Sequence, residues 1–403
     1  MELGHDGAAK PALAMRWSSQ NDDQRWALQL RAGVSFQDGA PLTADAVVAS
    51  LDESCALSSV SGTQTSGVLP QCPWSAVSSV GVSEVVITTN SPEPDLPELL
   101  AQTRFAISEK NSSGTIEGTG PFKVAGFSDG ALTLVANGAC WRGRPYLDSV
   151  EIFQHRSIRD QWLDLSVGQA DVVQVPPELL PEAQQQHLNV LVSRPIDLLA
   201  LSIPTRGEFA DLNMRQAAEQ AVDRTALHNV IFQKQGTVTA SLLPGWLSGY
   251  GFLFPTARNL SGAQALRGGA FAAPVTLSAK GDNAILQLAA ERLALNLNEA
   301  GFKMRTGLSN AQSGLQLRVV HLGETQPRAA LDEMLNAFGI NVTVSGSNPE
   351  VLWGVEKTAL QNATVAPLLW LPRAWASGER VRDLRLSPDG EPMLADVSLE
   401  DAK

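Results

Sequence analysis

A strand–helix–strand pattern in residues 275–306 limits the fold of this chain more than any other feature. Val275, Leu277 and Ala279 alternate as in a strand, and apolar residues from 285 to 297 then recur at helical spacing. Gly301 ends that helix before a second strand at residues 302–306. A helical crossover of this kind joins parallel strands, so the sequence predicts an α/β lobe whose ligands bind beyond the carboxyl ends of its strands.

Other segments add elements around this unit. Residues 26–52 show a strand, a turn and a helix for which Thr43 is a natural N-cap. Apolar positions from 211 to 233 recur at helical spacing, which predicts one long amphipathic helix capped by Asp211. Further strands are predicted at residues 131–135, 149–153 and 316–322, the first two as a hairpin-like pair.

The length of the chain argues for more than one lobe. A single hydrophobic core rarely serves as many as 403 residues, so two or three cooperating lobes are expected. No stretch reaches the roughly 18 unbroken apolar residues of a membrane-spanning helix. We therefore expect a soluble chain built from several lobes.

Charge and motif content exclude several functional classes. Lys and Arg total 30 against 42 Asp and Glu, a net charge of −12, so nucleic acid is not an expected partner. GxSxG, GxGxxG and P-loop motifs are absent, and the five histidines lack metal-binding spacing. We expect no enzyme activity, no cofactor and no metal, although a hydrolase site assembled from distant residues is an alternative.

Three cysteines are too few for a disulfide scaffold. Cys55 and Cys72 bracket a Ser- and Gly-rich segment that an oxidised pair would staple in an exporting compartment. Two reduced, half-buried thiols are an equal alternative.

Nine tryptophans against two tyrosines make indole the main candidate for ligand contact. Trp246, Trp370 and Trp375 flank proline-containing turns, and we predict that these three line a cleft. For any one tryptophan taken alone, packing in a core is the more common role, since an indole buries a large apolar area wherever it lies, so both roles stay open for each of the three.

Three motifs occur in a fixed order along the chain. The first runs from Leu30-Arg31-Ala32-Gly33 through Phe36 and Asp38-Gly39 to Pro41-Leu42-Thr43-Ala44. The second is Gly118-Thr119-Gly120-Pro121-Phe122, followed by Pro145-Tyr146-Leu147-Asp148. The third is Arg215-Gln216-Ala217 with Ala221-Val222-Asp223-Arg224. On these motifs the chain resembles the family 5 solute-binding proteins of ABC importers, the class that includes dipeptide, oligopeptide and nickel-carrier binders.

The resemblance implies a fold and a division into domains. The fold would be α/β, like a type II periplasmic binding protein, with two lobes joined by a two-segment hinge. Residues 1–115 would form an extra subdomain of the first lobe, residues 116–200 and 373–403 its sheet domain, and residues 201–372 the second lobe.

The resemblance also implies a function. The chain would bind a peptide or another small solute between its lobes and deliver it to an ABC transporter permease by hinge closure. It would act as a monomer in the periplasm, or outside the cell in association with the membrane. A sensory or regulatory ligand-binding module of the same fold is the alternative.

Two departures from the family pattern affect this expectation. The family normally carries a further N-terminal segment before the Pro11-Ala12-Leu13-Ala14 turn, and the given sequence begins just upstream of that turn. Peptide-binding relatives also carry an aspartate for the ligand's ammonium group in the stretch that corresponds to residues 320–327. Gly323 or Glu324 occupies that position here, so Glu324 is the candidate acid.

Overall fold

The computed structural model divides the chain into two compact units. The first unit comprises Met1–Val173 and Ala376–Lys403, and the second comprises Gln174–Trp375, so the chain passes between them twice. The structure describes residues 1–4, 7–59, 72–111, 114–154, 156–186, 188–251, 253–269, 273–280, 283–307, 314–344 and 346–400.

The boundary between the units differs from the expected one near residue 200. Residues 174–200 belong to the second unit because β13 (Asn189–Ser202) is part of its sheet. β13 pairs with β17 (Leu315–His321) in the register Asp197 opposite His321 to Ser202 opposite Gln316. These ladder bonds hold the strand in the second unit. The last segment returns to the first unit at Ala376 rather than at residue 373.

The first unit begins with one small two-stranded sheet, β1–β2, which a strand-rich core follows. Its elements are β1 (Glu2–Leu3), β2 (Ala9–Lys10), β3 (Ala14–Gln20), β4 (Arg25–Leu30), α1 (Ala44–Ser59), β5 (Trp74–Val80), β6 (Glu84–Thr89), α2 (Leu96–Leu100), η1 (Thr103–Phe105), β7 (Ser108–Lys110), β8 (Ile116–Gly118), β9 (Phe122–Ser128), β10 (Ala131–Ala136), β11 (Ser149–Phe153) and α3 (Ile158–Ser166). The returning tail adds β19 (Val381–Arg382), β20 (Arg385–Leu386), β21 (Pro392–Met393) and β22 (Ser398–Leu399).

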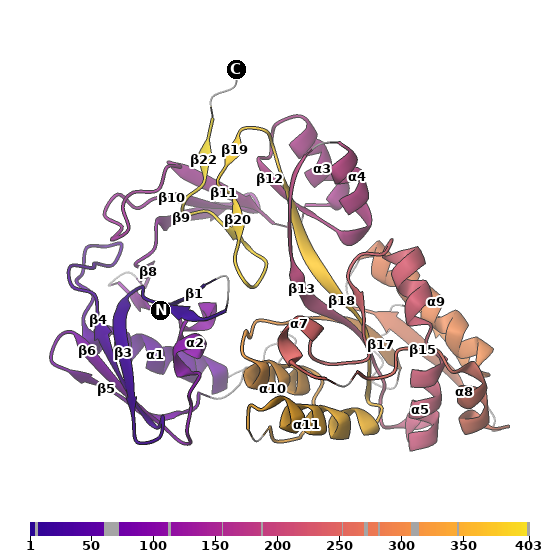
Figure 1. Ribbon diagram of the computed structural model, residues 1–403. Helices are drawn as coiled ribbons and strands as arrows, with labels where there is room; N and C mark the ends of the chain where they lie inside the picture. Colours follow the sequence, from indigo (N-terminus) through magenta and orange to yellow (C-terminus); the bar gives the residue numbers. More distant parts are fainter. Residues whose placement is uncertain are drawn as a thin grey trace. The chain divides into compact units, whose positions relative to one another are not determined.

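The core of the first unit lies between a four-stranded sheet and helix α1. The sheet has the order β3-β4-β6-β5 and lies next to α1 (Figure 1). Its inward residues Trp26, Leu28 and Ile87 pack in one core with Val47 and Leu51 of α1. The Thr43 Oγ1 atom accepts a hydrogen bond from the Ala46 N–H at 3.2 Å, which confirms the predicted N-cap.

Helix α1 is also tied covalently to the segment just before β5. Cys55 of α1 and Cys72 form a disulfide with a Cα–Cα distance of 5.8 Å, so the oxidised alternative holds in the structure. Cys140 is a free, buried thiol. Residues 60–71, which the two cysteines bracket, lie outside the described residues.

A separate three-stranded sheet follows, in the order β11-β10-β9. The predicted pairing of residues 131–135 with 149–153 is confirmed, with Ala131 opposite Phe153 and Val135 opposite Ser149. Gln37 of the first motif holds the start of β9, since its Nε2 donates to the Phe122 carbonyl at 2.6 Å and its Oε1 accepts from the Gly118 N–H at 3.2 Å. The first two motifs are therefore in direct contact.

The second unit contains one large mixed sheet and most of the helices. Its elements are β12 (Val172–Val175), η2 (Pro177–Leu179), α4 (Leu180–Gln185), β13, η3 (Gly207–Phe209), α5 (Leu212–Ala221), α6 (Arg224–Ala226), the π-helix η4 (Leu227–Ile231), β14 (Thr237–Val238), α7 (Gly245–Ser248), α8 (Leu260–Arg267), β15 (Pro274–Ala279), α9 (Ala284–Glu299), β16 (Lys303–Thr306), β17, α10 (Pro327–Ala337), α11 (Pro349–Gln361) and β18 (Val365–Ser377). Two of these strands, β12 and β18, extend across the boundary between the units.

Helices cover both faces of this sheet, whose order is β12-β18-β13-β17-β15-β16 (Figure 1). Successive residues of β13 point to opposite faces. Leu199 and Leu201 pack in the core that includes α5 and α9, whereas Leu198 and Ala200 pack in the core that includes α10 and α11. Burial on both faces explains why residues 198–201 of β13 and 365–371 of β18 are unbroken apolar runs.

The predicted βαβ unit is confirmed. β15 and β16 are parallel, with Val275 opposite Met304, and α9 connects them. The Asn283 side chain caps α9 by accepting from the Ile285 N–H at 3.0 Å, and Gly301 follows the helix at a φ of 97°. β17 extends the parallel part of the sheet on the other side of β15.

The single long helix predicted for residues 211–233 is wrong. α5 ends at Ala221, and Val222 is extended, with φ −71° and ψ 128°. The Asp223 carboxylate then accepts from the Ala226 N–H at 2.9 Å and starts α6 and the π-helix η4. The apolar spacing continues across the break because both segments face the same core, which is why periodicity alone missed it.

The third motif has a structural role that this break makes clear. Arg215 is 8% exposed, and its guanidinium donates to the carbonyls of Phe209 and Ala210 at 2.9 Å and of Asn362 at 2.8 Å. Arg224 is 1% exposed; its Nε donates to the Pro367 carbonyl at 2.8 Å and its Nη2 to Glu219 at 2.6 Å. The two arginines therefore fasten α5 and α6 to α11 and β18.

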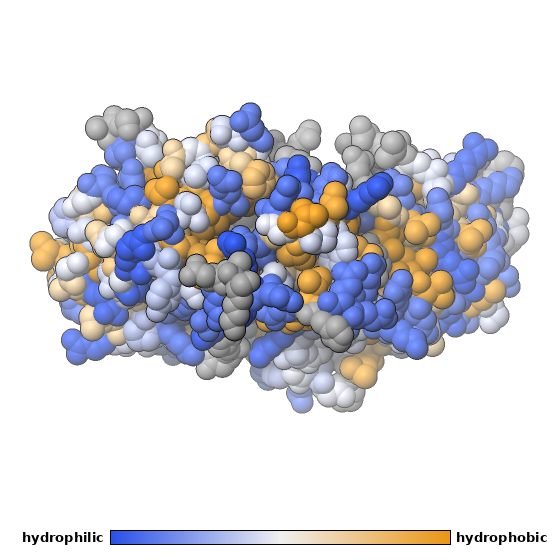
Figure 2. Space-filling model, turned by 90° about the horizontal axis from the view of Figure 1, so that it is seen from above, coloured by the Kyte–Doolittle hydropathy of each residue, from blue (hydrophilic) through white to orange (hydrophobic). Residues whose placement is uncertain are grey.

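Hydrophilic residues cover most of the face shown in Figure 2, and apolar residues there form separate patches. Among the described residues, no helix combines the length and the apolarity needed to cross a membrane.

Replacing Arg224 tests the role of the third motif. An Arg224→Met variant should lower the free energy of unfolding by about 3 kcal/mol, because the Pro367 carbonyl loses its buried donor and Glu219 loses its partner. Urea denaturation followed by circular dichroism measures this change. Arg305→Met, at an exposed position of β16, is the control and should change the value by less than about 0.5 kcal/mol. Equal values for the two variants would contradict the assigned role.

Candidate functional site

Three adjacent strands of the second unit bring charged side chains together at one edge of the sheet. β18 and β17 flank β13, and they contribute Arg373 and His321 on either side of Asp197. His321 is the last residue of β17, so the cluster lies at the carboxyl end of that strand. In open α/β sheets this edge is where ligands usually bind.

Asp197 is the centre of the cluster. Its Oδ2 accepts from Arg373 Nε at 2.9 Å and its Oδ1 from Arg373 Nη2 at 3.1 Å, a bidentate pair. The His321 Nδ1 atom lies 2.8 Å from Oδ1. Because a carboxylate only accepts hydrogen bonds, Nδ1 must carry the hydrogen in this pair, and Nε2 is the ring nitrogen that takes no part in it.

The environment of Asp197 keeps it charged. Burial by itself would raise the pKa of its carboxyl group, but the hydrogen bonds from His321 and Arg373 and the charge of Arg373 outweigh that effect. The net result is a pKa below the ordinary value for aspartate. At neutral pH Asp197 and Arg373 are therefore a fixed pair of opposite charges.

Trp246 is attached to the strand that carries Asp197, at a position two residues before it. It lies on the short helix α7, is 38% exposed, and donates from Nε1 to the Pro195 carbonyl of β13 at 2.9 Å. The Arg194 guanidinium carbon lies 5.2 Å from the centre of its ring. An exposed ring fixed at one end by a hydrogen bond is a ready surface for an apolar or planar part of a ligand.

The predicted acid, Glu324, follows β17 in the loop that leads to α10. It is 7% exposed, and its N–H donates to Glu333 of α10 at 3.0 Å. The Gly323 N–H donates to the same carboxylate at 3.1 Å and 3.2 Å. The loop is therefore held by an acid of the protein itself, and a role for the buried Glu324 carboxylate in ligand binding stays a prediction.

The other two predicted tryptophans differ from each other. Trp375 is half-buried near the end of β18, and its contact with a ligand stays a prediction. Trp370 is 2% exposed and packs in the core between the sheet and helices α10 and α11. The structure corrects the expectation for Trp370, since side chains in β18 alternate between faces and its indole points into that core.

Analysis of the sequence alone missed Arg194, Asp197, His321 and Arg373 as a group. A weak signal was present, because Asp197 and Arg373 are charged residues within long apolar strands, where charges are rarely placed without a partner. The partners could not be assigned without the strand order of the sheet.

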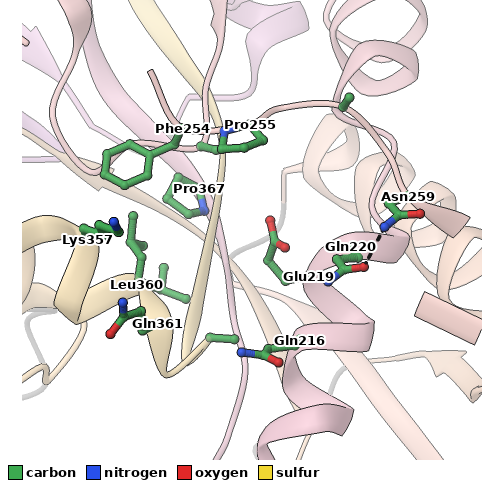
Figure 3. Close-up of a pocket in the computed structure, with 14 residues that line it drawn as sticks. Gln216, Glu219, Gln220, Phe254, Pro255, Asn259, Lys357, Leu360, Gln361 and Pro367 are labelled. Atoms are coloured by element: carbon green, nitrogen blue, oxygen red, sulfur yellow. Dashed lines mark hydrogen bonds between the residues drawn. The ribbon is translucent and has the colours of Figure 1, made fainter. Parts of the chain in front are cut away.

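A second hollow in the same unit has a volume of about 480 Å³ and is drawn in Figure 3. Phe254, Pro255 and Pro367 form an apolar wall opposite polar side chains of α5 (Figure 3). Three of its polar side chains already have partners within the protein: Glu219 pairs with Arg224, and Gln220 accepts from Asn259 at 3.0 Å. This hollow is a weaker candidate than the edge of the sheet.

The described part of the chain holds no group of three or more His, Cys, Asp or Glu side chains arranged to bind a metal ion.

Comparison with known proteins relates this geometry to a family. Residues 8–370 match the family model described as bacterial extracellular solute-binding proteins, family 5. The nickel-binding protein NikA of Staphylococcus aureus is 24% identical over 234 residues, which are 56% of this chain and 46% of that protein. Heme-binding protein A of Haemophilus influenzae is 25% identical over 271 residues, 60% of this chain and 50% of that protein. The matched part thus spans about half the length of these curated relatives.

Solved structures extend the likeness to the whole fold. The periplasmic binding protein DppA of Helicobacter pylori, solved in complex with the peptide STSA, superposes with a TM-score of 0.82. The match covers 99% of this chain and 92% of that one at 17% sequence identity. At this identity the likeness establishes the fold and nothing about the ligand.

An Asp197→Asn variant tests the charge cluster. It should lower the free energy of unfolding by about 2 kcal/mol at neutral pH, since Arg373 loses a charged, partly buried acceptor. Because the pKa of Asp197 is lowered in the folded state, this contribution is present above the unfolded value near 3.8 and is lost as the pH falls through the folded value. Denaturation curves at neutral and acidic pH measure it.

The matched control for this prediction is Asp148→Asn, in which the paired aspartate side chain is 88% exposed. A surface ion pair of this kind contributes less than about 1 kcal/mol. An Asp197→Asn effect as small as the control, or one that grows as the pH falls, would show that the cluster does not act as described.

Proposed function

Because this chain belongs to the bacterial extracellular solute-binding proteins of family 5, we propose that it is the solute-binding component of an ABC importer. It binds a small solute reversibly and presents it to a membrane permease. The observation that carries the proposal is the family match over residues 8–370, in a chain with the fold of the type II periplasmic binding proteins.

The proposed solute surface in the second unit is the edge of the sheet around Trp246. The indole supplies apolar contact area, and the Arg194 guanidinium lies at its ring. The His321 Nε2 atom is a further proposed polar contact. Trp375 is a further proposed contact. The Asp197–Arg373 pair joins β13 to β18. Its two opposite charges neutralise each other.

Family membership does not fix the cargo. The relatives' names cover nickel and heme, and one solved relative holds a peptide. In this chain the family's peptide-type acid position falls at Gly323 or Glu324, and Glu324 is 7% exposed. We therefore propose that the cargo is a small solute. A peptide, which would bring a free ammonium group to this acid position, is the second candidate.

The compartment follows from the same proposal. The Cys55–Cys72 disulfide suits an oxidising location outside the cytoplasm, because such bonds persist in secreted proteins and are rare in the cytosol. The protein would act there as a monomer and would not transform its solute.

Closure on solute is the first testable consequence. Contacts made by a solute with both units favour the state in which the units are drawn together, so saturating solute should reduce the radius of gyration. Native mass spectrometry of protein purified from its own host identifies the co-purified solute, and small-angle scattering with and without that solute measures the compaction. A scattering profile that stays the same at saturation would overturn closure.

Replacing Trp246 tests whether its indole contacts the solute. Trp246→Ala should raise the dissociation constant of the identified solute about tenfold, since a partly exposed aromatic contact of this size contributes roughly 1–2 kcal/mol. Isothermal titration calorimetry provides the measurement. Trp353→Phe, in α11 of the same unit and outside the edge of the sheet, should leave the affinity unchanged. Equal affinities for the Trp246→Ala and wild-type proteins would remove Trp246 from the site.

A further inference from the structure

A buried carboxyl group lies beneath the loop that carries Trp246. Glu356 of α11 is 0% exposed, and its Oε1 accepts from the Ser241 hydroxyl at 2.8 Å and from the Leu242 N–H. These two residues begin the segment 241–250, whose midpoint is helix α7 with Trp246. The start of the Trp246 loop is therefore attached to Glu356.

The end of the same loop also reaches Glu356. Tyr250 packs in the core that holds α11, and its buried hydroxyl lies next to the Glu356 carboxyl group. In the described part of the chain, Tyr250 Oη and Glu356 Oε2 are both buried without a well-formed hydrogen bond. Glu356 thus touches both ends of the loop, while one of its own oxygens is left unsatisfied.

We propose that Glu356 is a positioning residue for Trp246. Its carboxyl group holds the loop of residues 241–250 closed while it is neutral, and the loop opens to water when the group is charged. The proposal rests on the proposed function only in treating Trp246 as a solute contact.

The surroundings of Glu356 give the direction of this response. Leu242, Leu243 and Leu352 are at most 1% exposed and pack in the same core, so a charge on Glu356 sits in apolar surroundings. Burial is the largest influence and raises the pKa of Glu356 to about 7, although the hydrogen bonds from Ser241 and Leu242 and the nearby Tyr250 hydroxyl act to lower it.

The titratable groups near Glu356 are few. Tyr250 is the one titratable side chain that the described contacts bring to it, and its own pKa is raised by burial and by the Glu356 charge. On α11 the Lys357 ammonium lies 4.7 Å from the centre of the Trp353 ring, and Glu350 is exposed in the first turn. Oε1 keeps its two donors from the loop, and these do not titrate near neutrality.

The difference in the pKa of Glu356 between the closed and open loop decides which of the two states a rise in pH favours. A closed loop keeps Glu356 protonated up to a pH of about 7, whereas an open loop lets water restore a pKa near the ordinary 4.5. The closed form therefore binds the proton more tightly, and rising pH favours opening. The contribution of Glu356 to stability is complete below the lower value and is lost as the pH rises through the upper one.

Tryptophan fluorescence of the solute-free protein tests the proposal. The difference between wild-type and Trp246→Phe spectra isolates the emission of Trp246, which should shift to longer wavelength as the pH rises from about 5 to about 9. In Glu356→Gln the amide can accept from the Leu242 N–H and donate to Tyr250, so the emission should stay at the low-pH position throughout. Tyr250→Phe should enlarge the shift, since a donor to the charged form is lost.

Controls separate the possible outcomes. Glu350→Gln on the exposed first turn of α11 should titrate as the wild type does. Far-ultraviolet circular dichroism at each pH verifies that the protein stays folded. A Trp246 emission that does not respond to pH, or a Glu356→Gln variant that titrates like the wild type, overturns the proposal. Because no solute is present, neither result depends on the proposed function, which the calorimetry of Trp246→Ala tests separately.

Discussion

Burial of strand β18 on both faces is the constraint on which the second unit depends. Its residues from Val365 to Leu371 are all buried, and it lies between β12 and β13, with β14 also pairing to it. A strand of this kind needs helices on both sides. Pro367 interrupts its ladder, because proline has no N–H, and its carbonyl is taken instead by the buried Arg224. The same strand then carries Arg373 to the charged edge of the sheet.

The motifs that identify the family are parts of the scaffold. Arg215 and Arg224 fasten helices to the sheet through backbone carbonyls, and Gln37 joins the first motif to the second. Asn137 is 1% exposed and donates to the Gly120 carbonyl at 2.9 Å. Because the motifs consist of such residues, their presence in a sequence indicates how the chain folds. It carries little information about cargo, because none of these side chains lies at the edge of the sheet.

Two buried carboxyl groups of the second unit show how environment decides charge. Both Asp197 and Glu356 are buried enough for desolvation to raise the pKa. Asp197 receives a bidentate guanidinium and an imidazole, which outweigh burial and keep it ionised. Glu356 receives neutral donors, which do not outweigh burial. One group is a fixed part of the proposed site, and the other is poised to respond to pH.

The sequence by itself determined the elements that depend on short-range periodicity and on turn chemistry. The βαβ unit, the hairpin of β10 and β11 and the Thr43 cap are local, because apolar spacing and a single polar side chain specify each of them. Apolar spacing did not predict the helix break at Val222, since the helical segments on both sides of it face one core. Three ordered motifs were also enough to indicate the family.

Only the tertiary structure decided which residues meet. His321 and Arg373 reach Asp197 across 124 and 176 residues of sequence, and strand order alone places them side by side. Packing of α10 and α11 against one face of the sheet buried Trp370, whereas Trp246 on α7 stayed 38% exposed, although both flank proline turns. The physical reason is that burial and charge pairing are properties of the assembled sheet, whereas periodicity records only that a residue faces some core.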